Sequence, residues 1–299
     1  MIKLSVLIPT HGRPTLLGRT LESLSKCDIP KGYAETVVIE NGPKSGAEAV
    51  VGGAAVDYPH LNLRHMHVER ANKSHALNEA LKTIQDGLVV FFDDDIRMDA
   101  NILIAYAEAA SEQEDGAYFG GPMGSDFETP PPDWLLPLLP ASVRGFTLAD
   151  AAEAGYYLGA NWAAFVRDLH AVGGFDPNFG PGSPTGARGQ ENEMQRRLRR
   201  ASISAVDVAG AMVWHYVPAN RCSPQWTITR TYQTGLHRGV QVRSGEGTRM
   251  TRTGMKAIPR GAFRYLVAAA GRQQARRLEA KADLAFWIGY FRGFLTQIR

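Results

Sequence analysis

The segment Phe91-Phe92-Asp93-Asp94-Asp95 carries the most distinctive chemistry of this chain. Its three adjacent carboxylates follow an apolar stretch, residues 88–92, that is typical of a buried strand. Like charges this close repel one another and are costly beside a sheet, unless a cation or a positive ligand neutralises them. Carboxylate oxygens suit Mg²⁺ or Mn²⁺, which commonly bind through one or two carboxylates and the phosphates of a substrate. The run therefore indicates a metal-bridged phosphate ligand, with a solvated acidic turn as the alternative.

Strand and helix patterns alternate ahead of and just after these carboxylates. We expect strands over residues 4–9, 36–39 and 88–92, and helices over residues 15–25, 75–85 and 102–111. This alternation predicts an α/β fold with a mostly parallel central sheet flanked by helices. Ligands of such sheets bind beyond the carboxyl ends of the strands. Residues 9–13, 40–42 and 93–95 would then share one edge and form a single candidate site.

The second half of the chain gives a less regular pattern. Residues 120–145 are rich in Pro and Gly and are expected to form an ordered loop or lid. Within it, Trp134 either stacks on a sugar or anchors the loop by burial. Further on, we expect a helix from Met194 to Arg200 and a strand over about residues 205–214 that ends at His215.

Composition limits the class of protein. With 299 residues, of which 44% are hydrophobic and 21% charged, the chain can bury the core of one large domain with or without an extension. No apolar run approaches the roughly 18 to 20 residues that span a bilayer. The first residues enter a strand pattern without the features of a signal peptide, so we expect a cytoplasmic protein. Cys27 and Cys222 stand far apart in the sequence, which argues against a disulfide framework or a structural zinc site.

Charge divides the chain into two parts. Residues 1–220 hold 18 Lys and Arg against 27 Asp and Glu, whereas residues 221–299 hold 15 against 3. We therefore expect a main domain over 1–220 and a basic amphipathic helical extension over 221–299. Its apolar residues recur at three- and four-residue steps: Phe263, Leu266, Val267, Ala270, Leu284, Trp287, Ile288, Phe291, Leu295 and Ile298. Such helices most often pack against their own domain or a second subunit, as in a homodimer; the sharper hypothesis is peripheral contact with an anionic membrane.

Several separated blocks of the chain resemble family 2 glycosyltransferases, which are inverting enzymes of the GT-A fold that use nucleotide sugars. The resemblance covers about residues 3–221. The blocks are residues 5–10 (SVLIPT) with Arg13, 38–42 (VIENG), 72–78 (NKSHALN), 92–95 (FDDD), 159–161 (GAN), 172–176 (VGGFD), 190–193 (QENE) and 213–215 (VWH).

The resemblance implies a function. It implies transfer of a sugar from a nucleotide-diphosphate donor, most often a UDP-sugar, to a hydroxyl of a glycan or a lipid-linked acceptor, as in polysaccharide biosynthesis. It implies a divalent metal, Mn²⁺ or Mg²⁺, and no nucleic-acid partner. If the acceptor is lipid-linked, the enzyme would work in the cytoplasm at the inner face of the membrane.

The family pattern also implies roles for the acidic run and the histidine. Asp93-Asp94-Asp95 matches the family's D-x-D motif, in which Asp95 is expected to bind the metal while Asp93 and Asp94 contact the donor. His215 matches a position that often completes the contact with the metal or the diphosphate. Judged without the family, a lone His after a strand is more often packed than a ligand.

The expected general base is Glu191, because an attacking hydroxyl must lose a proton near the anomeric carbon. The family usually has Glu-Asp followed by a further acid, and this chain departs from it with Gln190-Glu191-Asn192-Glu193. Glu193 would take the role if the register shifts. Alternatively, both acids lie in the first turn of a helix, with Glu193 pairing with Arg197.

Further residues are expected at the donor and the acceptor by resemblance. Pro9 and Thr10 would contact the base or ribose through their backbone, with Arg13 nearby. Glu40 would bind the base in place of the usual Asp. Arg70 and Lys73 would lie near the base or the phosphates. The acceptor contacts are expected to be Trp134, Asn161 and Trp162.

Three rival functions were weighed against this one. Nucleotidyltransferases carry a Gly-rich, Arg-containing loop after the first strand, which Pro9-Thr10-His11-Gly12-Arg13 is not. Phospho-receiver domains need an acidic pair where this chain has Pro9 and Thr10. A nucleotide-sugar or glycan-binding module without transfer activity stays open because of the altered block at residues 190–193.

Overall fold

A computed structural model describes residues 2–113, 116–242, 244–271 and 273–296 of the chain. The chain forms two compact units. Unit 1 combines Met1–Asp126, Gly145–Gly182 and Gly189–Tyr216. Unit 2 combines Phe127–Arg144, Ser183–Arg188 and Val217–Arg299. Unit 2 thus contains the expected extension and, in addition, two short segments that the sequence pattern left with the main domain.

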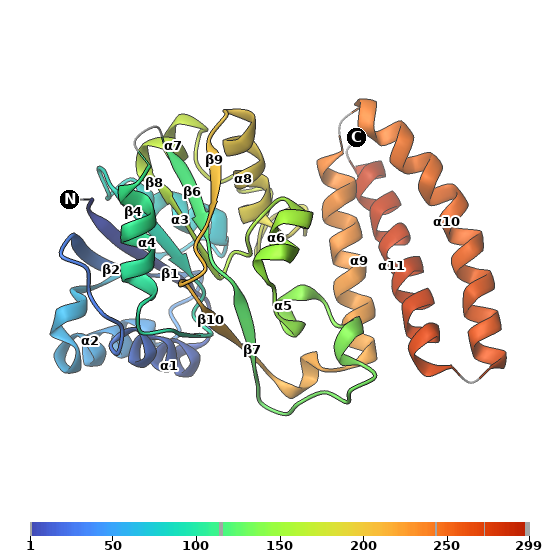
Figure 1. The fold of residues 1–299 in the computed structure, drawn as a ribbon, viewed down its shortest axis with the longest axis horizontal. Coiled ribbons are helices and arrows are strands. Elements are labelled where there is room, and N and C mark those ends of the chain that lie inside the picture. Colours follow the sequence, from blue (N-terminus) through green and yellow to red (C-terminus); the bar gives the residue numbers. More distant parts are fainter. Residues whose placement is uncertain (1, 114–115, 243, 272, 297–299) are drawn as a thin grey trace. The chain divides into compact units, whose positions relative to one another are not determined.

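The core of unit 1 is a seven-stranded sheet with the order β3-β2-β1-β4-β8-β6-β9 (Figure 1). The bounds are β1 (Leu4–Thr10), β2 (Tyr33–Asn41), β3 (Leu63–Val68), β4 (Leu88–Phe92), β6 (Ala117–Gly120), β8 (Asn161–Phe165) and β9 (Ser204–Asp207). Strands β3, β2, β1 and β4 run parallel, and β8 pairs antiparallel with both β4 and β6. The predicted α/β fold with a mostly parallel sheet is confirmed.

A second, three-stranded sheet has the order β5-β10-β7. Its strands are β5 (Ile96–Met98), β7 (Met123–Phe127) and β10 (Val213–Val217). β5 follows the three aspartates directly, and its antiparallel register places His215 opposite Ile96. This small sheet therefore brings His215 next to the end of the acidic run.

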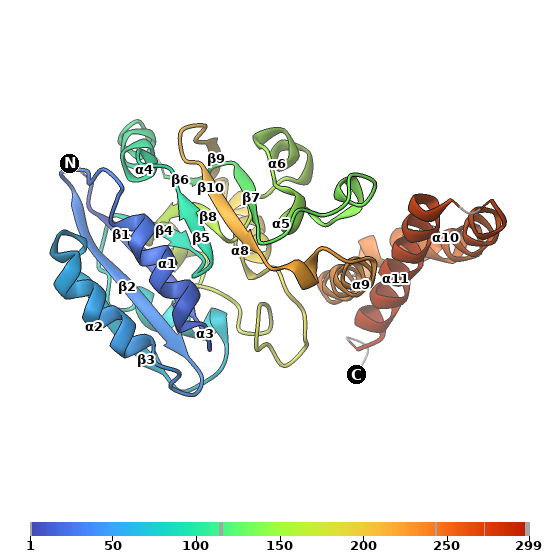
Figure 2. The same ribbon diagram turned by 90° about the horizontal axis from the view of Figure 1, so that it is seen from below.

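The helices of unit 1 lie over the sheet, with α1 and α2 side by side (Figure 2). They are α1 (Pro14–Leu24), α2 (Ala47–Asp57), η1 (Pro59–Leu61), α3 (Lys73–Leu81), α4 (Ile102–Ser111), α6 (Leu148–Ala154), α7 (Val166–Ala171) and α8 (Gln190–Arg200). Leu17, Leu21 and Leu24 of α1 are fully buried, as their spacing predicted. Thr20 exchanges hydrogen bonds with the backbone of Ile96, which fixes α1 to β5.

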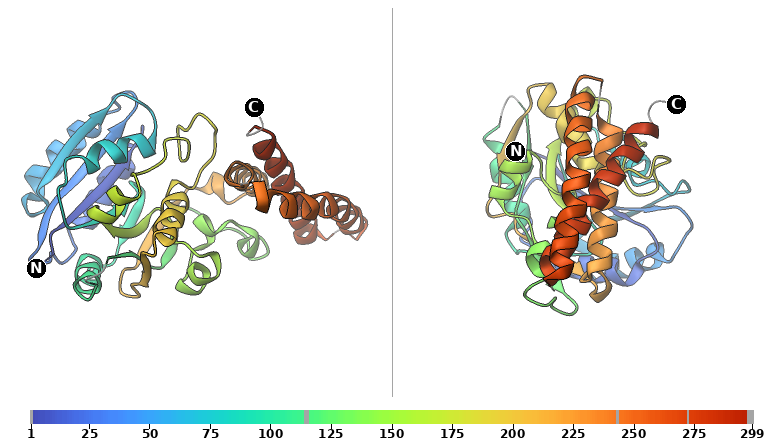
Figure 3. Two further views of the ribbon diagram at one scale, coloured as in Figure 1. Left: turned by 90° about the horizontal axis from the view of Figure 1, so that it is seen from above. Right: turned by 90° about the vertical axis from the view of Figure 1, so that its right-hand side faces the viewer.

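Unit 2 is helical. It contains η2 (Leu136–Leu138), α5 (Ala141–Arg144), η3 (Ala219–Arg221), α9 (Pro224–Gln241), α10 (Ser244–Ala270) and α11 (Gln274–Thr296). Helix α11 packs against both α9 and α10 (Figure 3). In the described part of the chain, no helix combines the length and the apolar character needed to cross a bilayer. Ile298, the last residue of the predicted apolar pattern, lies outside the described residues.

Three local predictions were wrong. The strand expected over residues 205–214 is two strands, because β9 joins the large sheet and β10 the small one. The helix expected from Met194 begins at Gln190, after Gly189 in a left-handed conformation (φ 82°). The expected loop of residues 120–145 contains strand β7 and the short helices η2 and α5.

Candidate active site

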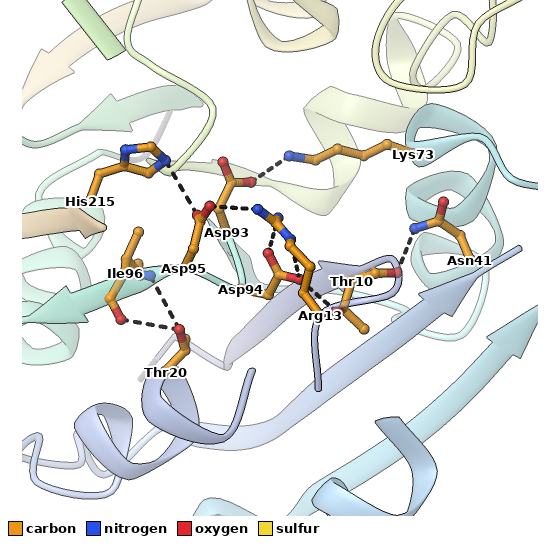
Figure 4. A network of polar contacts seen from close by, with 10 residues as sticks. All are labelled: Thr10, Arg13, Thr20, Asn41, Lys73, Asp93, Asp94, Asp95, Ile96 and His215. Atoms are coloured by element: carbon orange, nitrogen blue, oxygen red, sulfur yellow. Dashed lines mark hydrogen bonds and ion pairs between the residues drawn. The ribbon is translucent and has the colours of Figure 1, made fainter. Parts of the chain in front are cut away.

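The three aspartates follow β4 at the carboxyl edge of the parallel strands, but their carboxylates have different surroundings (Figure 4). The Asp93 side chain is 24% exposed and pairs with Lys73. The Asp94 side chain is fully buried, and that of Asp95 is 3% exposed. The sequence could not distinguish these three positions, because the difference depends on which cation reaches each carboxylate.

Asp94 is directed into the protein. It accepts a hydrogen bond from Thr10 Oγ1 at 2.6 Å and is paired with the guanidinium of Arg13. Burial raises the pKa of Asp94 to about 6, and the neighbouring carboxylates add to this rise, whereas Arg13 and Thr10 oppose it. Its interactions connect β1, the start of α1 and the acidic run. Asp94 therefore holds the edge of the site together and has no open face for the predicted donor contact.

Lys73 connects the acidic run with the proposed base. It is the first residue of α3, whose N-cap is Asn72, and its ammonium pairs with Asp93. Burial lowers the pKa of Lys73, but the charges of Asp93, Glu191 and Asp94 outweigh it, so the net pKa is raised. Lys73 therefore remains protonated and lies within the electrostatic reach of both Asp93 and Glu191.

Asp95 and His215 face each other across the small sheet. His215 Nε2 lies 3.4 Å from Asp95 Oδ1, and the amide of Tyr216 donates to the carbonyl of Asp95 at 2.7 Å. Arg13 Nη1 donates to the other carboxylate oxygen of Asp95 at 2.6 Å. His215 Nδ1 is buried and makes no hydrogen bond within the described residues. A carboxylate and an imidazole form a donor set that suits Mn²⁺.

The described residues contain no group of three or more His, Cys, Asp or Glu side chains arranged to hold a metal by themselves. This fits an ion that takes one or two protein ligands and completes its shell with substrate phosphates and water. Asp95 and His215 are the residues that would hold it.

Glu191 and Glu193 lie in the first turn of α8 but differ in their partners. Glu193 is 5% exposed and forms a two-point ion pair with Arg197, whose guanidinium also donates to the carbonyl of Gly174 at 2.7 Å. Through Arg197, Glu193 therefore helps to fix α8 to the turn at Gly174. Glu191 is only partly buried, and its carboxylate lies against Gly159, where an added Cβ would come within 3.1 Å of it.

Glu40 has both carboxylate oxygens occupied within unit 1. One oxygen accepts from Ser45 N at 2.5 Å and from Ser45 Oγ at 2.8 Å, and the other lies 3.2 Å from His65 Nε2. Although burial opposes it, these hydrogen bonds hold the pKa of Glu40 below its usual value. The residue is 0% exposed. Glu40 therefore closes the loop before α2, and its contact with the base stays a prediction.

The remaining predicted donor residues lie at the end of β1 and after β3. Pro9 and Thr10 are the last residues of β1, and both are buried. Arg70 is exposed in the loop after β3. Sequence reasoning assigned no role to His11, which is exposed and whose Nδ1 lies 2.5 Å from the carbonyl of Asn41. The signal for it was its place in the segment after β1.

The predicted acceptor residues are packed. Trp162 is 1% exposed and its ring stacks on Phe91 with centroids 4.6 Å apart. Asn161, also 1% exposed, accepts from Tyr106 Oη at 2.7 Å and donates to the carbonyl of Ala211 at 2.6 Å. Trp134 belongs to unit 2, where it packs on a cluster around Leu135. Trp162 and Asn161 therefore present no free face within unit 1, whereas Trp134 is only partly buried and its contact with an acceptor stays a prediction.

A pocket of about 350 Å³ adjoins Asp95 on the side of α1 and was not expected from the sequence. Its lining includes the basic residues Arg19, Lys26 and Arg97, together with Tyr216 from the end of β10. It is lined by residues of α1, β5, β7 and β10, so the pocket depends on the small sheet.

The comparisons with known proteins identify the family and the fold of the chain. The chain matches the family model described as Glycosyltransferase like family 2 over residues 3–231. No curated protein matches the chain in sequence. The mannosyltransferase PcManGT from Pyrobaculum calidifontis, solved with GDP-Man and Mn²⁺, is similar with a TM-score of 0.66 and 19% identity, covering 100% of this chain and 88% of that one.

Two further structures are similar in fold. TarS residues 1–349 from S. aureus, solved with UDP-GlcNAc, has a TM-score of 0.52 and 15% identity, covering 99% of this chain and 92% of that one. GalNAc-T7 with UDP, GalNAc and Mn²⁺ has a TM-score of 0.55 and 14% identity, covering 82% of this chain and 52% of that one. The fold is the GT-A fold, and the match over residues 3–231 shows that the chain belongs to the glycosyltransferase like family 2.

Proposed function

We propose that the protein is an inverting glycosyltransferase that moves a sugar from a nucleotide-diphosphate donor to a hydroxyl of a glycan or a lipid-linked acceptor. The observation that carries this proposal is the joint placement of Asp95 beside His215 and of Lys73, which pairs with Asp93 and lies within the electrostatic reach of Glu191. A UDP-sugar is the leading donor, supported by the UDP-GlcNAc and UDP named for two structural neighbours. The GDP-Man of the third makes a guanine donor the alternative.

In this proposal the partly buried Glu191 acts as general base. Its carboxylate accepts the proton of the acceptor hydroxyl while the hydroxyl oxygen attacks the anomeric carbon, and the bond between that carbon and the diphosphate oxygen breaks. Attack opposite the leaving group inverts the anomeric configuration. The positive charge of the protonated Lys73 offsets the negative charges of Asp93 and Glu191. Glu191 remains the group that accepts the proton.

Asp95 and His215 supply the ligands for a divalent ion, Mn²⁺ or Mg²⁺. When bound, such an ion offsets the negative charge that develops on the leaving diphosphate. Arg13 lies beside Asp95 and is the chain's own cation at this edge. We propose that it contacts the diphosphate, with Thr10, His11 and Arg70 near the nucleoside.

The test is the variant Glu191→Gln, assayed with a panel of UDP- and GDP-sugars and Mn²⁺ or Mg²⁺. We expect transfer to fall by about 10²- to 10⁴-fold, the usual contribution of a general base. Donor binding, read as a thermal shift, should stay close to that of the wild type. Persistent transfer in the variant would show that the base is misassigned. Donor binding by the wild type without transfer or donor hydrolysis would instead indicate a binding module.

A second variant tests the position of Glu191 without changing its chemistry. Gly159→Ala places a methyl group about 3.1 Å from the Glu191 carboxylate. We expect a lower kcat with little change in the donor KM, since the donor contacts are not touched. An equal loss in donor affinity would show that the substitution disturbs the whole edge.

A further inference from the structure

Helix α10 has large apolar side chains on its outside. Met255, Phe263, Leu266 and Val267 are 56% to 68% exposed. Of the eight large apolar side chains exposed among the described residues, six lie on α10 and α11, and unit 1 contributes only Val56. An exposed group of this kind in a protein usually marks a contact with another molecule.

The inner side of α10 is made of small residues. An added Cβ at Gly254 would come within 2.5 Å of the Trp287 ring, and one at Gly261 within 3.2 Å of Leu284, while Ala268 is 3% exposed. The close approach to α11 is thus achieved by glycine and alanine. The large apolar residues of α10 are not needed for packing within unit 2 and face outward instead, which reverses the usual pattern of a surface helix.

A basic row runs beside the apolar residues. Arg252, Lys256, Arg260 and Arg264 follow each other at four-residue steps and are all exposed, so they form one line along the helix. The first three make no ion pair with the described residues, and Arg264 pairs with Asp283 at 2.8 Å. At the end of α10, a hollow of about 290 Å³ is lined by Phe263 and Val267, by Arg264 and Arg276, and by Glu279, which lies 3.5 Å from Arg264.

We propose that this outer face of α10 binds an anionic lipid surface. The face is defined by Met255, Phe263, Leu266 and Val267 with the basic row Arg252, Lys256, Arg260 and Arg264. Exposed apolar side chains beside exposed cations, three of which make no ion pair with the described residues, are the combination that a helix lying in the membrane interface requires. The apolar residues enter the boundary between headgroups and acyl chains, and the cations contact lipid phosphates.

The charge of this face argues against a second copy of the chain as its partner. Two such faces would bring two basic rows together, and like charges across an interface are costly. The inference does not depend on the proposed enzymatic activity, because lipid binding is measured without donor or acceptor.

The experiment is flotation of the full chain with vesicles of phosphatidylcholine alone or of equal parts phosphatidylglycerol and phosphatidylcholine. We expect binding to the anionic vesicles only, and weaker binding at high salt. The double variant F263S/L266S should weaken binding by about tenfold or more, since two large apolar side chains are lost from the interface. K256Q/R260Q should weaken it by about fivefold per charge at low salt.

The matched controls are V56S, which removes the exposed apolar residue of unit 1, and Lys3→Gln, which removes an exposed charge of unit 1. Both should bind like the wild type. Circular dichroism checks that the variants fold, which we expect because the substituted side chains are exposed. Absence of binding to anionic vesicles, or equal losses in the controls, would overturn the proposal. So would light scattering that shows F263S/L266S turning a dimer into a monomer while vesicle binding is unchanged.

Discussion

Units 1 and 2 achieve close packing and place their charges in opposite ways. In unit 1 large apolar residues such as Trp162 and Phe92 fill the core, and charged side chains are buried at the strand ends with partners. In unit 2, Gly235 and Gly239 of α9 face Gly289 and Gly293 of α11, where added Cβ atoms would lie within about 2 Å of the opposing backbone. Charges in unit 2 are mostly exposed. Unit 1 thus holds charged side chains with partners at its strand ends, whereas unit 2 exposes apolar and basic groups on α10.

The largest effect is expected from removing a charge of the candidate metal site. Asp95→Ala should reduce transfer by about 10²- to 10³-fold, comparable with the loss of one preorganised electrostatic contact. Arg252→Gln, which removes an exposed charge of α10, should leave transfer to a soluble acceptor within about twofold of the wild type. Transfer rates measured at a fixed donor concentration and varied Mn²⁺ concentration give the loss in each variant. Equal losses in the two variants would remove the contrast between the units.

Two arginines test the same contrast in stability. Arg13→Ala leaves the buried Asp94 without its cation and should lower the free energy of unfolding by about 3 kcal/mol at pH 8, less than for a fully buried pair because the Arg13 side chain is 36% exposed. Arg264→Ala, which breaks an exposed pair with Asp283, should cost about 0 to 1 kcal/mol.

The loss from Arg13→Ala should also depend on pH. The pKa of Asp94 is raised to about 6, so its ionisation weakens the native state as the pH rises from about 4 through 6. Without Arg13 this pKa rises further, so the variant should lose more stability at pH 8 than at pH 5, where Asp94 can take up a proton. Urea unfolding with a chelator at both values measures this. The same loss at both would show that Arg13 does not act through the Asp94 charge.

Glycine substitutions test how the two units differ in packing. Gly289→Ala places a Cβ about 2.1 Å from the Tyr232 carbonyl oxygen and should lower the free energy of unfolding by about 1 to 3 kcal/mol. Gly52→Ala, in the exposed part of α2 with no neighbour within 4 Å, should raise it by about 0.5 to 1 kcal/mol through helix propensity. Thermal unfolding followed by circular dichroism compares them. A stable Gly289→Ala variant would mean that α9 and α11 are less tightly packed than described.

The smallest effect is expected at Glu40. Its pKa is held below the usual glutamate value, so its stabilisation is present at neutral pH and is lost as the pH falls through the acid range. Glu40→Gln should therefore cost about 1 kcal/mol at pH 7 and less than this at pH 3. Glu48→Gln, which breaks an exposed pair with Lys44, should change little at either pH. Urea titrations at the two pH values separate the cases, and a pH-independent loss at Glu40 would exclude the charge as its cause.

The sequence predicted those parts of the fold that have a strong period. The leucines of α1 and the apolar run of β4 locate two elements and the edge between them. β5, with three residues, is too short to show a period, and the break between β9 and β10 depends on pairing with different sheets. The family was correctly recognised from separated blocks, which individual periods do not reveal.

The side-chain environments were not predictable in the same way. Positions 93, 94 and 95 are all aspartate, so the sequence does not tell them apart. Their partners come from elsewhere in the chain: Thr10, Arg13, Lys73 and His215. Glu40 and Trp162 were expected at the donor and the acceptor by resemblance, and in the structure they hold a loop and pack in the core. Such outcomes depend on contacts between distant residues, which a pattern along the chain does not contain.

The pairing of β5 with β10 has a consequence for biosynthesis. Asp95 and His215 meet only through this ladder, although 119 residues separate them in the chain. During translation the nascent polypeptide carries its aspartates long before the last strand of unit 1 leaves the ribosome. The histidine arrives last, so an incomplete chain cannot present the paired ligands.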